Sequence, residues 1–205
     1  MKFYSYVIPR DYGFAPNPYF NYCTLATCKP RIRRGAQVGD WVGAFGSMRT
    51  AVSGKLVALM CVDETMTFDE YWEESRFRIK RPVFNKSKMY MYGDNIYHHV
   101  GNKWMQEPSH HSNVDGSINY INLERDTQTD RVLIGTEFYY FGNNAIPIPT
   151  EYSILIGKGR NHKVCSEEML VNDFINYVRC NYRRGINGVP YSRKSDNFVH
   201  YGGEK

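Results

Sequence analysis

Short apolar runs alternate with polar, Gly-rich or Pro-rich stretches along the first third of the chain. Residues 3–8 form an aromatic and β-branched run that stops at Pro9, as expected for a first strand. Two further apolar runs, residues 41–45 and 55–62, are separated by a glycine-bracketed loop over residues 46–54. This pattern predicts a β-hairpin around which the rest of the fold is organised.

Two helices are indicated by capping residues and by apolar spacing. Thr67 and Glu70 have the spacing of a capping box, which predicts a short helix directly after the hairpin. Further on, Ser166 is a candidate N-cap, and apolar residues recur at four-residue spacing from Leu170 to Val178. We expect the second helix to pack against the sheet.

The chain has 205 residues, which is enough for one domain with a sizeable core. The order of elements predicts an α+β protein, built on a compact, strongly bent β-sheet or a PUA-like β-barrel flanked by a few helices. A hairpin that runs into a short helix is similar to the layout of PUA-like proteins, including EVE domains, where a small barrel holds a nucleobase. We expect one domain over residues 1–190, with an inserted His-rich segment, and a flexible tail over residues 191–205.

Charge and composition narrow the class of partner. Lys and Arg number 26 against 21 Asp and Glu, and much of the excess lies in residues 29–34 and 76–81, the second of which alternates like an edge strand. Such runs form solvated surfaces or contact phosphates, so a nucleotide or nucleic acid, DNA above all, is the expected partner. No apolar run approaches the roughly 20 residues of a membrane span, and five cysteines without a Cys-x-x-Cys pair suit a cytoplasmic protein with reduced thiols.

Candidate ligand-binding residues follow from the 15% aromatic content and from the basic run before the hairpin. Base recognition needs aromatic faces for stacking and polar groups for the base edge, and phosphates need cations. For the base we expect Arg10, Tyr12, Phe14, Asn17, Trp41, Asp94, Asn95 and His98. For the phosphates we expect Lys29, Arg31, Arg33 and Arg34.

Four of the six histidines lie between positions 98 and 111. Imidazole titrates near neutral pH and binds borderline metals, so this cluster suits acid–base chemistry or ligand binding, with structural histidines as the alternative. No spacing matches a recognised zinc pattern, so no metal ligand is assigned, and no cofactor is indicated. If the protein is an enzyme, the expected catalytic residues are His98, His110, His111, Asp126 and Asp130.

Several blocks of the sequence resemble one family. They are FYSYVIPRDYGFAPNPYF, CTLATCKPRIRRGAQVGDWV, TFDEYW, YGDNIYHH, SHHS and DTQTDRVLIG. Through them the chain, apart from its tail, resembles the nucleotide modification associated domain 2 family. That family is thought to accompany DNA-modification gene sets in bacteria and phages, so the resemblance implies a role with modified nucleotides or nucleic acid. It supplies no set of catalytic residues.

Three functions are consistent with these observations. The first is a nucleotide- or modified-base-binding protein that holds a base in an aromatic, His-lined cleft. The second is an enzyme that acts on a nucleotide or nucleobase through His and Asp acid–base residues. The third is a non-catalytic docking module that binds other proteins of a modification complex. A binding protein would bind without turnover, whereas an enzyme would show a pH-dependent rate.

Overall fold

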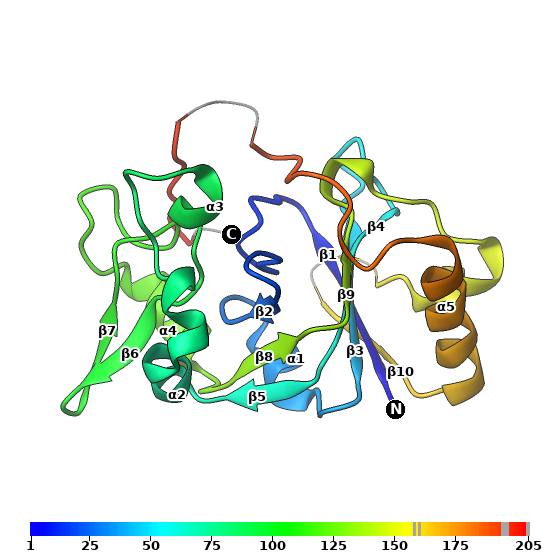
Figure 1. The fold of residues 1–205 in the computed structure, drawn as a ribbon, viewed down its shortest axis with the longest axis horizontal. Coiled ribbons are helices and arrows are strands. Elements are labelled where there is room, and N and C mark those ends of the chain that lie inside the picture. The colour runs from blue at the N-terminus through cyan, green and yellow to red at the C-terminus, as the bar shows by residue number, and fades with distance from the viewer. Residues whose placement is uncertain (158, 160, 194–196, 204–205) are drawn as a thin grey trace.

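The computed structural model describes residues 1–157, 159, 161–193 and 197–203 (Figure 1). Its strands are β1 (Phe3–Ile8), β2 (Cys23–Leu25), β3 (Trp41–Gly46), β4 (Leu56–Cys61), β5 (Glu64–Met66), β6 (Tyr97–Val100), β7 (Lys103–Gln106), β8 (Val132–Gly135), β9 (Phe138–Tyr140), β10 (Lys163–Cys165) and β11 (Gly185–Ile186). Its helices are α1 (Pro30–Gly35), α2 (Phe68–Glu73), α3 (Lys88–Met91), α4 (Tyr120–Thr127) and α5 (Glu168–Asn181), with 3-10 turns η1 (Ser75–Lys80), η2 (Gly142–Asn144) and η3 (Thr150–Leu155). The predicted α+β class is confirmed.

A six-stranded mixed sheet forms the centre of the molecule, in the order β10-β1-β3-β4-β9-β11. The predicted hairpin is present, because β3 pairs antiparallel with β4, and β1 runs parallel to β3 on its other side. Helix α5 covers one face of this sheet (Figure 1), where Val171 and Phe174 share a buried cluster with Phe3 and Trp41. The N-cap predicted at Ser166 is wrong by one residue, since α5 is preceded by Glu167 as N-cap, without a side-chain capping bond.

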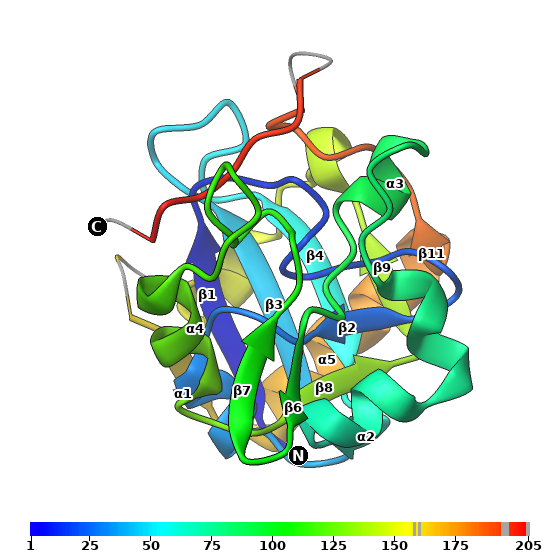
Figure 2. The same cartoon turned by 90° about the vertical axis from the view of Figure 1, so that its left-hand side faces the viewer.

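The second sheet has the order β2-β8-β5 and lies on the side of the large sheet away from α5 (Figures 1 and 2). Strand β4 pairs with β9 in the large sheet, and β5 pairs with β8 in the second sheet. Because β5 starts three residues after β4 ends, and β9 starts three residues after β8 ends, the segments β4–β5 and β8–β9 each run from one sheet into the other (Figure 1). Among the described residues these sheets close no barrel, and the large sheet is not curled. The bend therefore lies between two open sheets.

A third layer holds α2, α3, α4 and the β6–β7 hairpin, which stand in front of the large sheet in Figure 2. The capping box predicted at the start of α2 is confirmed, because the Thr67 side chain accepts from the Glu70 amide and the Glu70 carboxylate accepts from the Thr67 amide. The edge strand predicted over residues 76–81 is wrong, because residues 76–80 belong to η1, whose first turn is capped by the Glu74 side chain at the Arg76 amide, and Arg81 follows as the C-cap.

The division between a domain and a tail stays a prediction, and residues 194–196 and 204–205 of the expected tail lie outside the described residues. Between those gaps, Val199 and Tyr201 contact the third layer: the amide of Tyr201 donates to the carbonyl of His110 at 2.7 Å. In the part of the chain that the structure describes, no helix is long and apolar enough to cross a bilayer.

Candidate active site

A cavity of about 560 Å³ opens where the end of β1, the start of α1 and the loop before α4 meet. Its volume lies within the range of small-molecule sites. The cationic side chains that line it are Arg10, Lys29, Arg31 and Arg125, and no Asp or Glu is among its described lining residues. Aromatic rings form much of the remaining wall, including those of Tyr6, Tyr12, Phe14 and Tyr201. The cavity therefore suits an anionic ligand that carries a planar group.

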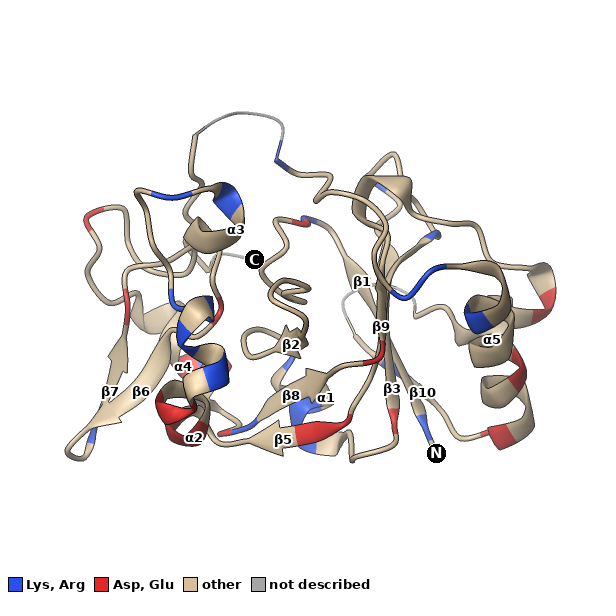
Figure 3. Ribbon diagram, viewed as in Figure 1, with Lys and Arg blue, Asp and Glu red and all other residues tan. Residues whose placement is uncertain are grey.

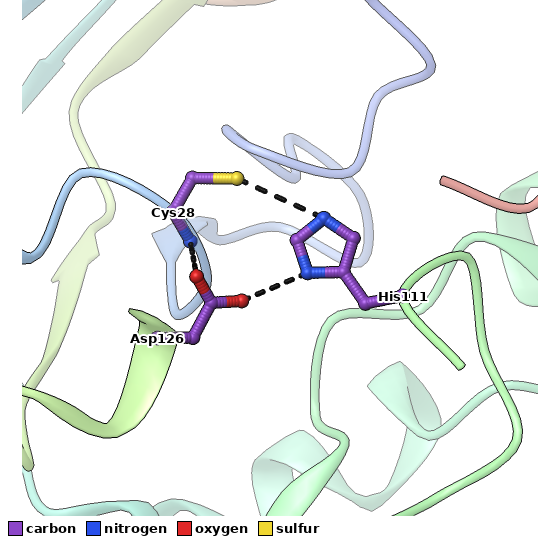
Figure 4. A group of neighbouring side chains, drawn as sticks. All are labelled: Cys28, His111 and Asp126. Atoms are coloured by element: carbon purple, nitrogen blue, oxygen red, sulfur yellow. Dashed lines mark hydrogen bonds and ion pairs between the residues drawn. The ribbon is translucent and has the colours of Figure 1, made fainter. Parts of the chain in front are cut away.

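Cys28 and His111 line this cavity, and the buried Asp126 lies next to both of them (Figure 4). The Sγ atom of Cys28 lies 3.8 Å from Nε2 of His111, and Nδ1 of His111 lies 2.8 Å from Oδ2 of Asp126. The other oxygen of Asp126 accepts the backbone N–H of Cys28 at 2.9 Å. A thiol, a base in contact with it and a carboxylate that orients the base form the arrangement of a nucleophilic triad.

The backbone at Cys28 is held in an unusual conformation. Cys28 and Lys29 have φ values of 57° and 42°, in the left-handed region that L-residues with a side chain seldom adopt. Pro30 then starts α1, with its φ suited to a first helical residue. Arg33 Nε donates to the Cys28 carbonyl at 2.9 Å, so the turn is fixed through both its amide and its carbonyl. Strain maintained in this way is typical of a functional position.

Asp126 is fully buried and accepts four hydrogen bonds. Besides the two already described, Tyr97 donates its hydroxyl at 3.0 Å and Arg125 donates Nε at 3.0 Å. Burial alone raises the pKa of Asp126, but the charge and hydrogen bond of His111, followed by the charges of Arg125 and Arg33, hold that pKa well below its usual range. Asp126 is therefore a carboxylate at neutral pH.

The pKa values of the two other members of the triad, His111 and Cys28, shift in opposite directions. Burial lowers the pKa of His111, but Asp126 and then Cys28 outweigh it and raise that pKa to about 9. Burial raises the pKa of Cys28, but the neighbouring His111 charge brings it below the ordinary value of a thiol. A thiolate beside an imidazolium is the reactive form of a nucleophilic cysteine.

The same three side chains are also the group whose ligand atoms lie within 4.8 Å of one another among the described residues, as a metal site requires. Their present bonds fit a metal ion poorly. Nδ1 of His111 already faces Asp126, both Asp126 oxygens accept hydrogen bonds, and Arg125 lies 3.0 Å from one of them. Because a divalent cation would have to displace these donors beside Arg125 and Lys29, the donor set fits the triad better than a metal.

The model of the nucleotide modification associated domain 2 family matches residues 1–197. The chain belongs to this family. The resemblance seen in the sequence is thereby confirmed, and so is an association with nucleotide modification. No curated protein and no solved structure matches the chain. Of the residues at the cavity, Tyr201 lies beyond the matched part of this family member.

Many residues expected from the sequence to bind or react come together at this site. Those that line the cavity are Arg10, Tyr12, Phe14, Lys29, Arg31, His110 and His111. Asp126 joins them through its bond to His111. Sequence reasoning missed Cys28, Arg125 and Tyr201. The sequence gives no signal that separates Cys28 from the four other cysteines of the chain.

Three expected base-contacting residues lie in a buried polar network away from the cavity lining. Nζ of Lys80 donates to the Asn17 side chain at 2.7 Å and to the Thr24 hydroxyl at 3.0 Å. The same hydroxyl donates to Asp94 at 2.6 Å, and Asn95 donates to two backbone carbonyls. Most of these buried polar groups are paired with one another or with the backbone, although Oδ1 of Asn95 has no hydrogen-bond partner among the described residues.

The remaining expected residues are also engaged elsewhere. Trp41 lies in the core beneath α5, and His98 stacks on an indole ring of α2 with 4.0 Å between ring centroids. Asp130 accepts a backbone amide at the start of α2 at 2.7 Å. Arg33 donates to four backbone carbonyls, and Arg34 donates to one at 2.8 Å. Each of these side chains has a structural partner.

Proposed function

We propose that this family member is an enzyme that uses Cys28 as the nucleophile toward a nucleotide bound in the cavity. The observation that carries this proposal is the geometry of the triad, with Sγ of Cys28 3.8 Å from His111 and His111 2.8 Å from a buried Asp126. The nucleotide is suggested by the family's association with nucleotide modification and by the composition of the cavity wall.

The cavity wall suits each part of a nucleotide. Four cationic side chains offer donors to phosphate oxygens, and no carboxylate in the described lining opposes an anion. Arg10 and Arg125 lie 5.0 and 5.5 Å from the ring of Tyr201, so this ring and both cations border the same space. Tyr12 and Phe14 add aromatic surface for a base. The nucleotide is either free or a single unit flipped out of DNA, which is the favoured polymer.

The triad suits substitution at a trigonal carbon of the nucleotide, such as the carbon of an amide, ester or amidine group. The thiolate of Cys28 attacks this carbon and forms a C–S bond, while the π electron pair moves onto the attached oxygen or nitrogen. When the pair returns, the leaving group departs with its bonding electrons and takes the proton from Nε2 of His111. Water, deprotonated by His111, then attacks the same carbon and the thiolate leaves, so the net reaction is hydrolysis.

Nucleotide binding without turnover is the second candidate, and the cationic, aromatic wall of the cavity favours it in the same way. The two candidates differ only in the role of Cys28. In a binding protein, Cys28 could be replaced by Ala with the ligand still bound and nothing else lost. In an enzyme, the same change abolishes turnover.

Alkylation of Cys28 by iodoacetamide, followed by mass spectrometry at several pH values, tests the proposal. Exposed Cys180 is the internal control. We expect Cys28 to react faster than Cys180 near pH 6.5, and this advantage to disappear in His111→Gln because the thiolate loses its counter-ion. Nucleotides should slow the reaction of Cys28 alone. Equal rates for the two cysteines, unaffected by His111→Gln, would exclude the proposed nucleophile.

Turnover is tested by incubating the protein with modified nucleotides and with enzymatic digests of modified DNA, and then searching for mass changes. Cys28→Ser is the matched control, because it keeps the size of the side chain while a hydroxyl is not ionised at neutral pH. A product formed by the wild type and absent with Cys28→Ser supports the enzyme. Protection of Cys28 by nucleotides without any product favours the binding protein.

A further inference from the structure

His110 lines the cavity next to the triad, but its surroundings differ from those of His111. It is 7% exposed, and its ring centroid lies 4.8 Å from that of Tyr12 and 5.1 Å from that of Phe14. Nδ1 is hydrogen-bonded to the backbone carbonyl of Val199, in the segment that follows the family match. The amide of Tyr201 in turn donates to the carbonyl of His110. His110 is therefore fixed by the C-terminal segment on both its ring and its backbone.

The bond to Val199 sets which nitrogen of His110 carries the hydrogen. A carbonyl oxygen only accepts, so Nδ1 must be the donor, and a neutral imidazole then has its lone pair on Nε2. Burial, followed by the positive charge of His111, lowers the pKa of His110 to about 3, so the ring stays neutral. Adjacent histidines thus differ: His111 has a raised pKa and faces the sulfur of Cys28, whereas His110 is a neutral ring with an acceptor at Nε2.

The Nε2 atom of His110 makes no hydrogen bond to any described residue, and it is not among the atoms sealed from solvent. Because the residue lines the cavity, this lone pair is available to a ligand there. A polar atom that is left unpaired at the wall of a largely apolar pocket is the kind of group that gives such a pocket its specificity.

We infer that His110 is a specificity-determining residue whose Nε2 accepts a hydrogen bond from an amino group on the base of the bound nucleotide. This inference rests on the proposed nucleotide site. The amino groups of adenine and cytosine donate to such an acceptor. At the same ring positions hypoxanthine and uracil carry oxo oxygens, which have lone pairs and no hydrogen to donate to Nε2. The base class is therefore one that bears an exocyclic amine, and the oxo bases are rejected.

The test uses matched pairs of ligands and a matched pair of variants. The ligands are AMP with IMP and CMP with UMP, and the same four bases in single-stranded oligonucleotides. Dissociation constants are measured as protection of Cys28 from iodoacetamide. We expect the amino member of a pair to bind about 10-fold more tightly than the oxo member, as one hydrogen bond and the avoided mismatch imply.

His110→Asn is the informative variant, because its amide N–H can still donate to the Val199 carbonyl while the acceptor at Nε2 is gone. We expect the preference between the paired ligands to fall to about 1 in His110→Asn. His162→Phe changes another histidine of the cavity wall and should retain the preference. His110→Phe provides a second removal of the acceptor, and urea unfolding checks that each variant is folded.

The outcomes separate the inference from the function on which it rests. Protection by both members of each pair with equal affinity overturns the role of His110 and leaves the nucleotide site standing. A preference that His110→Asn does not change, or tighter binding of the oxo members, also overturns it. If no monophosphate and no oligonucleotide protects Cys28, the proposed function fails and the inference fails with it.

Discussion

Replacing Cys28 by Ala isolates the titration of His111 and makes its charge measurable through folding stability. In the wild type, folding raises the pKa of His111 to about 9 and lowers that of Cys28. The first shift binds a proton on folding between pH 6.5 and 9. The second releases a proton on folding in the range below the ordinary pKa of a thiol, so the two effects on stability have opposite signs and partly offset each other. Cys28→Ala removes the second effect and leaves the first.

The sign and the size follow from the structure. In Cys28→Ala, Asp126 still lies 2.8 Å from His111 and is the strongest of the groups that raise its pKa. A folded pKa above the unfolded value of about 6.5 contributes stability that is complete below pH 6.5 and is lost as pH rises through the folded pKa. With about 9 as the upper limit, the loss is at most about 3 kcal/mol.

Urea unfolding of Cys28→Ala and of the double variant Cys28→Ala/His111→Gln at several pH values between 6 and 9 measures this difference. As the pH rises from 6 to 9, we expect the free energy of unfolding of the single variant to fall by up to about 3 kcal/mol more than that of the double variant. The free energy of unfolding of the wild type should depend less on pH than that of Cys28→Ala. Parallel curves for the single and double variants would mean that His111 is neutral in the folded protein, and the thiolate would lose its counter-ion.

Four further outcomes are expected. Lys80→Met should lower the free energy of unfolding in urea by about 3–5 kcal/mol, because the buried carboxylate near Lys80 loses its cation; an unchanged midpoint would contradict this. Thr67→Ala should cost about 0.5–2 kcal/mol in the same assay through loss of the cap on α2. Gly93→Ala should cost more than Gly101→Ala, because its Cβ would lie 2.1 Å from a backbone oxygen, whereas Gly101, with φ of 60°, has nothing within 4 Å. A chelator should leave the alkylation rate of Cys28 unchanged, whereas a faster reaction would indicate a bound metal.

Elements with local signals were predictable, and those decided by tertiary contacts were not. The β3–β4 hairpin follows from two apolar runs and its glycines, and the start of α2 from its capping box. Residues 76–81 alternate charged and apolar side chains as a strand would, but Phe77 is fully buried in the third layer and the segment forms η1. Periodicity over six residues could not distinguish these outcomes, because the deciding contacts come from distant residues.

The site was predictable in its residue types but not in its assembly. His111 and Asp126 are 15 positions apart, and Cys28 is 83 positions before His111. No short motif joins such residues, so the sequence does not indicate Cys28, although it indicates both of its partners. The polar residues Asn17 and Asp94 suit a base edge equally well by type, but the fold uses them around a buried Lys80. Residue type alone does not separate these two uses.

The distribution of charge favours the cavity over the outer surface as the binding site of an anionic ligand. Figure 3 shows Lys and Arg spread over several elements with Asp and Glu among them. The two basic runs of the sequence are largely used by the protein itself: Arg33 donates to backbone carbonyls, Arg76 pairs with Glu64 and Glu74, and Lys80 is buried. Lys29 and Arg31 of the first run, together with Arg10 and Arg125, line the cavity beside Cys28. The net charge of +5 is therefore a poor guide to DNA binding in this chain, because the cations with no acidic neighbour in the described lining surround one cavity of nucleotide size.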